Sequence, residues 1–553
     1  MSPFLDDVVS EQQDDIASLK LKLEGFAASA LEINPHKIRN QSHKTWLALG
    51  GDSLTAVNFM GSCYKAGIDV DIPDIFQSPS LDDLINRIVR SHQTTQSASN
   101  GIKPPHKDSG ESENGSLSPY GPPEGHRWDR LRSVLRGPLS EIQGIGPCSP
   151  MQENFIALQR IDVRSYQLRI AARMSSTNPA VVVTTDTVKK SWLAVVKRHA
   201  ALRTMFVESV DRTGRFDQVV WRNINPQVSV LPLSEAENNE EYGTEFPHHL
   251  ILGQAPDNKV FVKLLISHAV MDGVSIEVLL RDLCRSLTGT LPAGEALQCG
   301  SFLRAQQPDT SQEALSYWSR YMAATEGSFL SSPSSKKSPT GLYSIDQEMP
   351  IRPELAQNLS AQFNATLVNA CQIAYALVLR CYTGANNVCF SYTTSGRQKR
   401  MKGLHNAVGS FINTLPCRVD FGETTTIAEA LERIQSDFLD GLPYQGANLT
   451  DKQEMSGASV RQLSDSLLSF YGGLPETELA KAGFVIDVVS WDAPSDVCKP
   501  SNQDSWLAGT NMQFTVPLHP DDWSRPTPTG APIQCVGIAD KQRRCTQHDA
   551  ALP

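Results

Sequence analysis

The stretch over residues 93–126 most constrains how this chain can fold. It is rich in Ser, Gly, Pro and Asn and nearly lacks large aliphatic side chains. Such a composition cannot bury enough apolar surface to offset the entropy of ordering the chain. We therefore expect a flexible linker over residues 93–140, with separate folded units before and after it.

The segment before the linker has the pattern of a small helical domain. Apolar residues recur at helical spacing from Ile16 to Leu31, and again in the segment LTAVNFMGSCYKAG. A last helix is expected in PSLDDLINRIVRSH, where Pro and Ser precede two aspartates of the first turn. We assign residues 16–92 to a four-helix domain and residues 1–15 to an N-terminal tail.

The part after the linker has the pattern of two α/β lobes. Alternating apolar residues predict strands in YQLRIAARM and KVFVKLLISHAV, whereas WLAVVKRHAALRTMF and GVSIEVLLRDLCRSL have helical periodicity. The same mixture of helix and strand patterns recurs after about Leu342. We place the first lobe at residues 141–340 and the second at residues 341–497.

This pattern disappears after about Val497. The remaining residues contain frequent prolines, no amphipathic helix of ordinary length and at most one short strand, around MQFTV. We expect residues 498–553 to form an atypical, disordered tail and the second lobe to be incomplete. An uncovered sheet edge of this kind promotes aggregation.

Charge and cysteine content narrow the class of function. A net charge of −10 argues against nucleic acid as the main partner. No run approaches the ~18 apolar residues of a membrane span, and the first residues lack the pattern of a signal peptide. The 11 cysteines include no CxxC pair, which disfavours a disulfide framework and a structural zinc site. We expect a cytoplasmic protein without a metal, a nucleic-acid partner or a membrane partner.

The first candidate site is the sequence GGDS, which ends at Ser53. Gly50 and Gly51 permit a sharp turn, and Asp52 can cap a helix that begins near Ser53. The Ser53 hydroxyl would then stand at the positive end of a helix, where a phosphodiester is favoured. Taken alone, the pattern is equally that of an ordinary helix cap.

The helical segment around LGGDSL resembles the carrier, or thiolation, domain of nonribosomal peptide synthetases. The positions that match its core motif are Trp46, Leu47, Leu49, Gly51, Asp52, Ser53 and Leu54. The resemblance implies that a 4′-phosphopantetheine arm is attached covalently to Ser53 and carries aminoacyl or peptidyl thioesters. It also implies a phosphopantetheinyl transferase as a partner.

The second candidate site lies at His268, in the segment KLLISHAVMDGVSIEVLLRDL. A mostly apolar strand ends at His268, and a helix is expected to begin near Val274. A histidine at the end of a strand can face a channel and act as a base near neutral pH. Asp272 could form an ion pair that shapes the loop, and Gly273 permits the turn. A lone histidine before such a turn is more often structural.

This segment resembles the HHxxxDG motif of the condensation-domain superfamily, which shares its fold with chloramphenicol acetyltransferase. Three further motifs occur in the order typical of the family: CSPMQENFIALQ, KRHAALRTMF with Arg203, and VGSFINTLPCRV with Asn413 and Arg418. The resemblance covers roughly residues 145–492. It implies that His268 faces a tunnel between the two lobes and deprotonates or positions the attacking amine.

The same resemblance assigns a structural role to Asp272, which would bind a framework arginine; Arg203 is a candidate for that partner. The first histidine of the motif is Ser267 in this chain. The resulting SHxxxDG form resembles terminal condensation-like domains of fungal synthetases, including cyclising and siderophore-type ones. Two basic segments, KKSPTG and GRQKRMKG, are interpreted as solvated loops, and the second could touch a phosphopantetheine phosphate.

Together these resemblances imply a synthetase component of the ligase class, acting in secondary-metabolite or siderophore biosynthesis. No adenylation domain is apparent, so another synthetase module or an adenylating enzyme in trans would charge the carrier. His268 would then act as the base in forming an amide, an ester or a macrocycle. Two alternatives stay open: epimerisation of a carrier-bound residue, and a degenerate condensation lobe that only docks partners.

Overall fold

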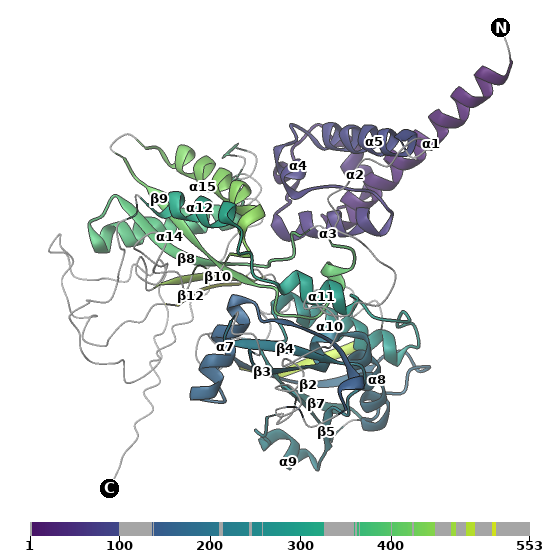
Figure 1. Cartoon of the computed structure of the whole chain (residues 1–553). Helices are drawn as coiled ribbons and strands as arrows, with labels where there is room; N and C mark the ends of the chain where they lie inside the picture. The colour runs from purple at the N-terminus through teal and green to yellow at the C-terminus, as the bar shows by residue number, and fades with distance from the viewer. Residues whose placement is uncertain are drawn as a thin grey trace, which may run out of the picture.

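The structure of the chain is a computed structural model (Figure 1). It describes residues 3–31, 33–98, 135, 138–209, 214–242, 246–256, 258–323, 325, 359, 362–363, 365–399, 401–422, 425–447, 449, 466–471, 483–492 and 511–515. These residues form a helical domain, drawn in purple, and two lobes that each contain a β-sheet.

The N-terminal domain is helical, as expected. Its elements are α1 (Pro3–Ala30), α2 (Pro35–Asn40), the short 3-10 helix η1 (Leu47–Leu49), α3 (Ser53–Lys65), α4 (Ile72–Gln77) and α5 (Leu81–Ala98). Its core is apolar and includes the adjacent, tilted rings of Trp46 and Phe59, whose centroids are 5.2 Å apart. This core holds α3 and therefore fixes the position of its first turn.

Two boundaries of this domain differ from expectation. Helix α1 begins at Pro3 and occupies most of the predicted N-terminal tail, and α5 continues to Ala98, into the predicted linker. Neither extension contains an internal glycine or proline, the residues that most disfavour a helix. The rest of the predicted linker up to residue 134 lies outside the described residues.

The first lobe contains two sheets. The strands of the three-stranded sheet, in spatial order, are β1 (Ile142–Pro147), β4 (Phe216–Trp221) and β3 (Thr204–Glu208). Those of the five-stranded sheet are β11 (Phe484–Asp492), β2 (Gln167–Ser176), β7 (Val260–Ser267), β6 (His248–Gln254) and β5 (Gln227–Val230). The helices are α7 (Pro150–Ile161), α8 (Thr185–Arg198), α9 (Leu233–Asn238), α10 (Gly273–Leu287) and α11 (Cys299–Gln306), with 3-10 turns η2 (Leu139–Glu141) and η3 (Ala200–Arg203).

Strand β7 determines where the candidate histidine lies. All of its residues are buried except the half-buried Val262, so both faces of the strand are covered. This explains the nearly continuous apolar run in its sequence. The chain leaves the sheet at Ser267, and His268 is the first residue after the strand.

The second lobe is built on a four-stranded sheet. Its strands, in spatial order, are β12 (Asn511–Thr515), β10 (Leu467–Tyr471), β8 (Asn387–Thr394) and β9 (Asn413–Asp420). The helices are α12 (Gln312–Met322), α14 (Leu367–Thr383) and α15 (Ile427–Gly441), with 3-10 turns η4 (Leu404–Asn406) and η5 (Leu442–Tyr444).

Two strands correct the predicted ends of this lobe. Strand β11 was expected in the second lobe, but it pairs antiparallel with β2 of the first lobe from Phe484 to Asp492. Strand β12 lies in the predicted disordered tail, yet it pairs antiparallel with β10. Both strands occupy sheet edges that would otherwise present unpaired backbone groups, which favours their pairing. The prediction of disorder is therefore wrong for residues 511–515, and the other residues of 498–553 lie outside the described part.

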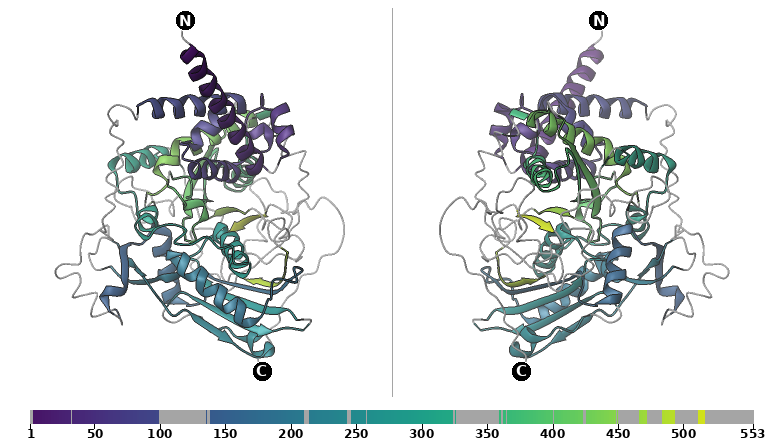
Figure 2. Two further views of the ribbon diagram at one scale, coloured as in Figure 1. Left: turned by 90° about the vertical axis from the view of Figure 1, so that its right-hand side faces the viewer. Right: turned by 90° about the vertical axis from the view of Figure 1, so that its left-hand side faces the viewer.

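The helical domain contacts the second lobe. In both views of Figure 2 it lies at one end of the molecule, and the sheets of the first lobe lie at the other. Leu439 of α15 and Leu442 of η5 pack against the apolar core of the helical domain. The arrangement places α3 beside the second lobe.

Candidate functional site

The first candidate residue, Ser53, is the first residue of α3. Asp52 caps the helix: its Oδ1 accepts a hydrogen bond from the Thr55 backbone N–H at 2.8 Å. The Thr55 hydroxyl oxygen in turn accepts from the Asp52 N–H at 2.7 Å. This capping box leaves the N-terminal end of the helix dipole at Ser53, as the sequence predicted.

Gly51 is required at its position by close packing. A β-carbon on Gly51 would overlap the indole ring of Trp46 and lie 2.8 Å from its carbonyl oxygen. The Gly51 N–H donates to that same carbonyl at 3.0 Å. Trp46 is 1% exposed and cannot yield to a larger residue. The turn before Ser53 is thus held against the core of the helical domain.

The second candidate residue, His268, is 9% exposed and lies between aromatic rings. Its ring centroid is 5.3 Å from that of Phe155 on α7 and 6.4 Å from that of Tyr166. Burial lowers the pKa of His268 below its ordinary value, although the Met271 carbonyl and the Asp272 carboxylate act in the opposite direction. The neutral imidazole is therefore the form present at neutral pH.

The hydrogen bond of His268 identifies its tautomer. Nδ1 lies 3.1 Å from the backbone carbonyl oxygen of Met271. A carbonyl oxygen can only accept, so Nδ1 carries the proton and donates it. The lone pair of the neutral ring is then on Nε2, which can accept a proton from a nucleophile.

Asp272 is fully buried and bound to an arginine, but not to the one expected. Its Oδ1 and Oδ2 lie 2.8 and 3.1 Å from Nη2 of Arg397, which follows β8 in the second lobe. Asp272 also caps α10 by accepting from the Ser275 N–H at 2.9 Å, and it accepts from the Phe411 N–H at 3.1 Å. These contacts give the carboxylate a framework role that joins the two lobes.

Arg203, the predicted partner of Asp272, lies elsewhere. It is 2% exposed in η3 and donates to the carbonyl oxygen of Trp221 and to the carboxylate of Glu295. A third bond runs from its Nη1 to Gln143 Oε1 at 2.6 Å. Arg203 therefore braces the three-stranded sheet, and the prediction that it pairs with Asp272 is wrong. The physical reason is that η3 directs the side chain toward β1 and β4.

Arg397 was missed because it lies in the segment GRQKRMKG, which we interpreted as a solvated loop. The structure corrects this: Arg397 is 1% exposed, and Lys399 is half-buried and donates to the Ala305 carbonyl at 2.6 Å. Burial also lowers the pKa of Lys399. The position of the segment in the sequence could have indicated that Arg397 is buried, because the segment directly follows a strand that ends at Thr394.

Ser267, which replaces the first histidine of the motif, is fully buried and acts within the turn. Its hydroxyl lies 3.0 Å from Gln159 Oε1 and 2.8 Å from Gln159 Nε2, and it accepts from the Ala269 N–H at 3.0 Å. The serine thus ties the turn around His268 to α7. Gly273 is the first residue of α10 and does not have a positive φ, so the turn does not depend on the left-handed freedom of glycine.

The remaining motif residues divide between the lobe junction and the framework. Asn413 begins β9 and lines a pocket between the lobes. Arg418, on the same strand, donates to the Tyr321 carbonyl at 2.9 Å and stacks on the Tyr321 ring, which fastens β9 to α12. Arg418 is not among the residues that line the pocket.

This pocket lies between the two lobes. Its lining residues are Ser149, Pro150, Ala305, Gln306, Gln307, Gly396, Lys399, Ser410, Phe411, Asn413 and Gly446. His268 does not line it but packs on the same helix, since Phe155 lies five residues beyond Pro150 on α7, about 7.5 Å along the axis.

Buried polar groups in this pocket lack partners. Within the described residues, neither amide atom of Gln306 makes a hydrogen bond, although this side chain is 3% exposed. The hydroxyl of the fully buried Ser410 also has no partner there. Unsatisfied buried polar groups are costly, so these side chains are suited to a bound polar group such as an amide.

Comparison with protein families agrees with this architecture. A family model described as "Condensation domain" matches residues 142–471, and one described as "Phosphopantetheine attachment site" matches residues 22–88. Because the first match covers more than half of the chain, the chain belongs to the condensation-domain family, with a phosphopantetheine attachment region before that domain. The predicted order of carrier and condensation domains is confirmed.

Similar proteins are fungal synthetases. The FR901469 synthetase of Dothideomycetidae sp. (strain 11243) is 34% identical over 522 residues, which are 92% of this chain and 3% of that protein. Nonribosomal peptide synthetase cm3A of Cordyceps militaris is 30% identical over 469 residues, which are 82% of this chain and 10% of that protein. The chain therefore spans a tenth or less of the length of these relatives.

Solved structures share the fold. The structure described as "The crystal structure of SeMet-CT" has a TM-score of 0.51 and 18% identity, and the match covers 70% of this chain and 88% of that one. For "The crystal structure of holo T3CT" the TM-score is 0.50 and the identity 19%, with 68% of this chain and 85% of that one covered. These likenesses confirm the predicted fold class.

The structure also bears on metals and membranes. Among the described residues, no group of three or more His, Cys, Asp and Glu side chains is placed to hold a metal ion. In the same part of the chain, no helix has the length and apolar character that crossing a membrane requires.

Proposed function

We propose that this chain carries an acyl or peptidyl group on Ser53 and condenses it with an amine, or with a hydroxyl, in nonribosomal peptide synthesis. The observation that carries the proposal is the state of His268. Its Nδ1 is committed to the Met271 carbonyl, and its lowered pKa keeps the ring neutral, so Nε2 is available as a base.

The attachment region suits a phosphopantetheine arm. The first turn of α3 offers backbone N–H groups and the positive end of a helix dipole to a phosphate at Ser53. The unpartnered amide of Gln306 and hydroxyl of Ser410 can satisfy amide groups of an arm that enters between the lobes. When bound, the arm supplies a thiol that holds the acyl group as a reactive thioester.

In the reaction, His268 accepts one proton and then donates it. The nucleophile forms a bond to the acyl carbon and loses its proton to His268 Nε2, while the bond from that carbon to sulfur breaks. The imidazolium returns the proton to the leaving sulfur, so His268 ends neutral. The Met271 carbonyl holds Nδ1–H throughout and keeps the ring oriented. Burial among Phe155 and Tyr166 excludes water that would compete with the nucleophile.

The partners follow from this role. A phosphopantetheinyl transferase would modify Ser53, and another synthetase module or an adenylating enzyme would supply the acyl group. The product is released as an amide, an ester or, with an internal nucleophile, a macrocycle. The relatives that are named synthetases support a role in stepwise synthesis by successive modules.

The test uses the full chain with a short peptidyl group loaded on Ser53 from its coenzyme A thioester by a broad-specificity transferase. Intact mass should rise by one loaded arm, and Ser53→Ala should show no gain. With a panel of amines, His268→Ala should lower turnover ~10²–10⁴-fold without loss of loading.

Two outcomes would replace the proposal. Equal turnover in the His268→Ala variant would favour a docking scaffold without catalysis. Label entering the α-carbon of the loaded residue from deuterated water, without amide formation, would favour epimerisation.

A further inference from the structure

The contact between the helical domain and the second lobe is centred on Gly61 and His405. Gly61 lies in the middle of α3, eight residues after Ser53, and is buried. A β-carbon at this position would lie 2.7 Å from Cγ, 2.8 Å from Nδ1 and 2.9 Å from Cδ2 of His405. These atoms belong to the body of the ring, so a side chain at residue 61 would displace the whole imidazole.

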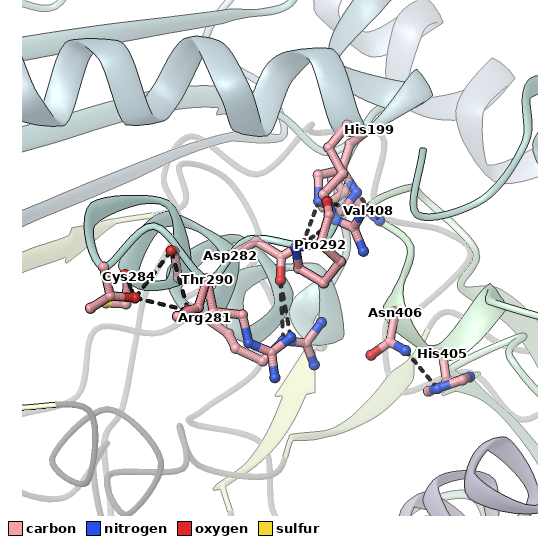
Figure 3. Close-up of polar contacts among 12 residues, drawn as sticks. His199, Arg281, Asp282, Cys284, Thr290, Pro292, His405, Asn406 and Val408 are labelled. Atoms are coloured by element: carbon pink, nitrogen blue, oxygen red, sulfur yellow. Dashed lines mark hydrogen bonds and ion pairs between the residues drawn. The ribbon is translucent and has the colours of Figure 1, made fainter. Parts of the chain in front are cut away.

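His405 belongs to the turn η4, and Figure 3 shows it beside a purple helical segment of the N-terminal domain. Leu439 of α15 and Leu442 of η5 add apolar contacts to the same domain. We call the surface formed by η4, Leu439 and Leu442 the carrier dock. It presents one ring to a helix and two leucines to the core beside that helix.

The backbone of the carrier dock is held from behind. Arg397 Nη1 donates to the carbonyls of Leu404 and Ala407, at 2.8 Å each. The Val408 N–H donates to His199 Nδ1 at 3.4 Å, a contact drawn in Figure 3. These hydrogen bonds hold the turn that contains His405 on both sides, so its backbone cannot easily move away from α3.

The same anchors reach the turn after His268. The Gly409 N–H donates to Ser275 Oγ at 3.1 Å, and the Phe411 N–H donates to Asp272 Oδ2 at 3.1 Å. Asp272 in turn binds Arg397. The carrier dock and the turn that ends in α10 thus share one hydrogen-bonded framework.

The charges around His405 require a neutral ring. Asn406 Nδ2 lies 2.7 Å from His405 Nε2; an amide nitrogen only donates, so Nε2 accepts. The positive charges of Lys65 of α3, Arg281 of α10 and Arg397 act on the ring. Burial is the largest cause that lowers the pKa of His405, and the three cations lower it further, to about 4. A protonated ring would oppose both the Asn406 donor and these cations.

We propose that the carrier dock selects its carrier by size, because His405 admits only a helix with glycine at the position of Gly61. The partner is the chain's own carrier domain, and any carrier with a bulky residue eight positions after its attachment serine is excluded. The inference rests on the carrier role proposed above and names the surface and residue pair that serve it. Glycine is unfavourable inside a helix. At position 61 the missing side chain allows the helix to approach His405 closely.

The first experiment measures the contact between the carrier domain and the carrier dock, and it does not require catalysis. In the full chain with labelled histidines, NMR titration should give His405 a pKa of about 4 in the wild type. Gly61→Leu should return it toward the ordinary value of about 6.5, because the ring leaves the interface. The matched control is Gly25→Leu on α1, where a β-carbon meets nothing within 4 Å. This control should leave the titration unchanged.

The second experiment tests size complementarity through turnover of the loaded carrier. Gly61→Leu should lower turnover about 5- to 100-fold, the range expected for overpacking a close contact. Gly61→Ala should give a smaller loss, and combining it with His405→Ala should restore part of that loss. Loading of Ser53 by the transferase should be equal in all variants, which shows that the carrier stays folded.

Three results would overturn the proposal. One is an ordinary pKa for His405 in the wild type, and another is an unchanged titration in Gly61→Leu. The third is additive losses for Gly61→Ala and His405→Ala, without recovery in the double variant. The titration does not depend on condensation, so it separates failure of the carrier dock from failure of the proposed function.

Discussion

Nη2 of Arg397 lies 2.8 Å from Oδ1 of Asp272, and the two residues are 125 positions apart in the chain. The arginine follows a strand of the second lobe, and the aspartate caps a helix of the first. Asp272 is fully buried and Arg397 is 1% exposed, so this ion pair joins the lobes in the interior. It also sets the turn between His268 and α10.

We expect Arg397→Leu to destabilise the condensation domain by about 3–5 kcal/mol, because it leaves the Asp272 carboxylate buried and unpaired. Thermal and denaturant unfolding of the full chain would measure the change. The double variant Arg397→Leu with Asp272→Leu should recover part of the loss, since no lone charge remains. A double variant less stable than Arg397→Leu would contradict this account.

The pH dependence of condensation should follow His268. Because its pKa is lowered, the ring is neutral and able to accept a proton across the neutral range. Turnover should therefore stay level as the pH falls to about 6.5, the ordinary histidine value, and decline only below it. The pH profile of turnover with a preloaded carrier would measure this. A decline that begins above pH 7 would show that another group titrates in the reaction.

A second buried histidine should control stability in acid. His248 is 1% exposed, its Nε2 donates to the Leu202 carbonyl at 2.7 Å, and burial lowers its pKa to about 4. As the pH falls from about 6.5, the unfolded chain binds this proton first, so the folded state loses stability until about pH 4. The loss amounts to about 3 kcal/mol.

His248→Gln keeps a donor for the Leu202 carbonyl and removes the titrating group. Unfolding free energies measured between pH 7 and pH 4 should therefore fall less steeply in this variant. His36→Gln, at an exposed position of α2, is the matched control and should follow the wild type. Identical slopes in the wild type and His248→Gln would refute the assignment.

Two glycines of the helical domain should respond in opposite directions to alanine. Gly51→Ala places a β-carbon against Trp46 and should destabilise the domain by about 1–3 kcal/mol. Gly25→Ala meets nothing within 4 Å inside α1 and should stabilise it by about 0.5–1 kcal/mol. The unfolding transition of the helical domain would measure both changes. Equal effects of the two substitutions would mean that Trp46 does not restrict residue 51.

The sequence predicted those features whose partners lie within a few residues. The cap of Asp52 on α3 joins residues three apart, and the place of His268 depends on the apolar strand directly before it. Two predictions, the pairing of Arg203 with Asp272 and the solvation of the segment around Arg397, needed partners far along the chain and were wrong. In both cases the partner lies far away in the sequence, so only the packing of the folded lobes identifies it.

The amino-acid sequence by itself determined the domain order, the helix start at Ser53 and the strand that delivers His268. These depend on hydrophobic periodicity and on capping, which act over one or two turns of chain. Only the tertiary structure decided that β11 completes the sheet of the first lobe, that Arg397 neutralises Asp272, and that Gly61 meets His405. These pairings depend on which strand edges and which buried charges lack a partner once the lobes have folded. A local sequence pattern does not contain that information.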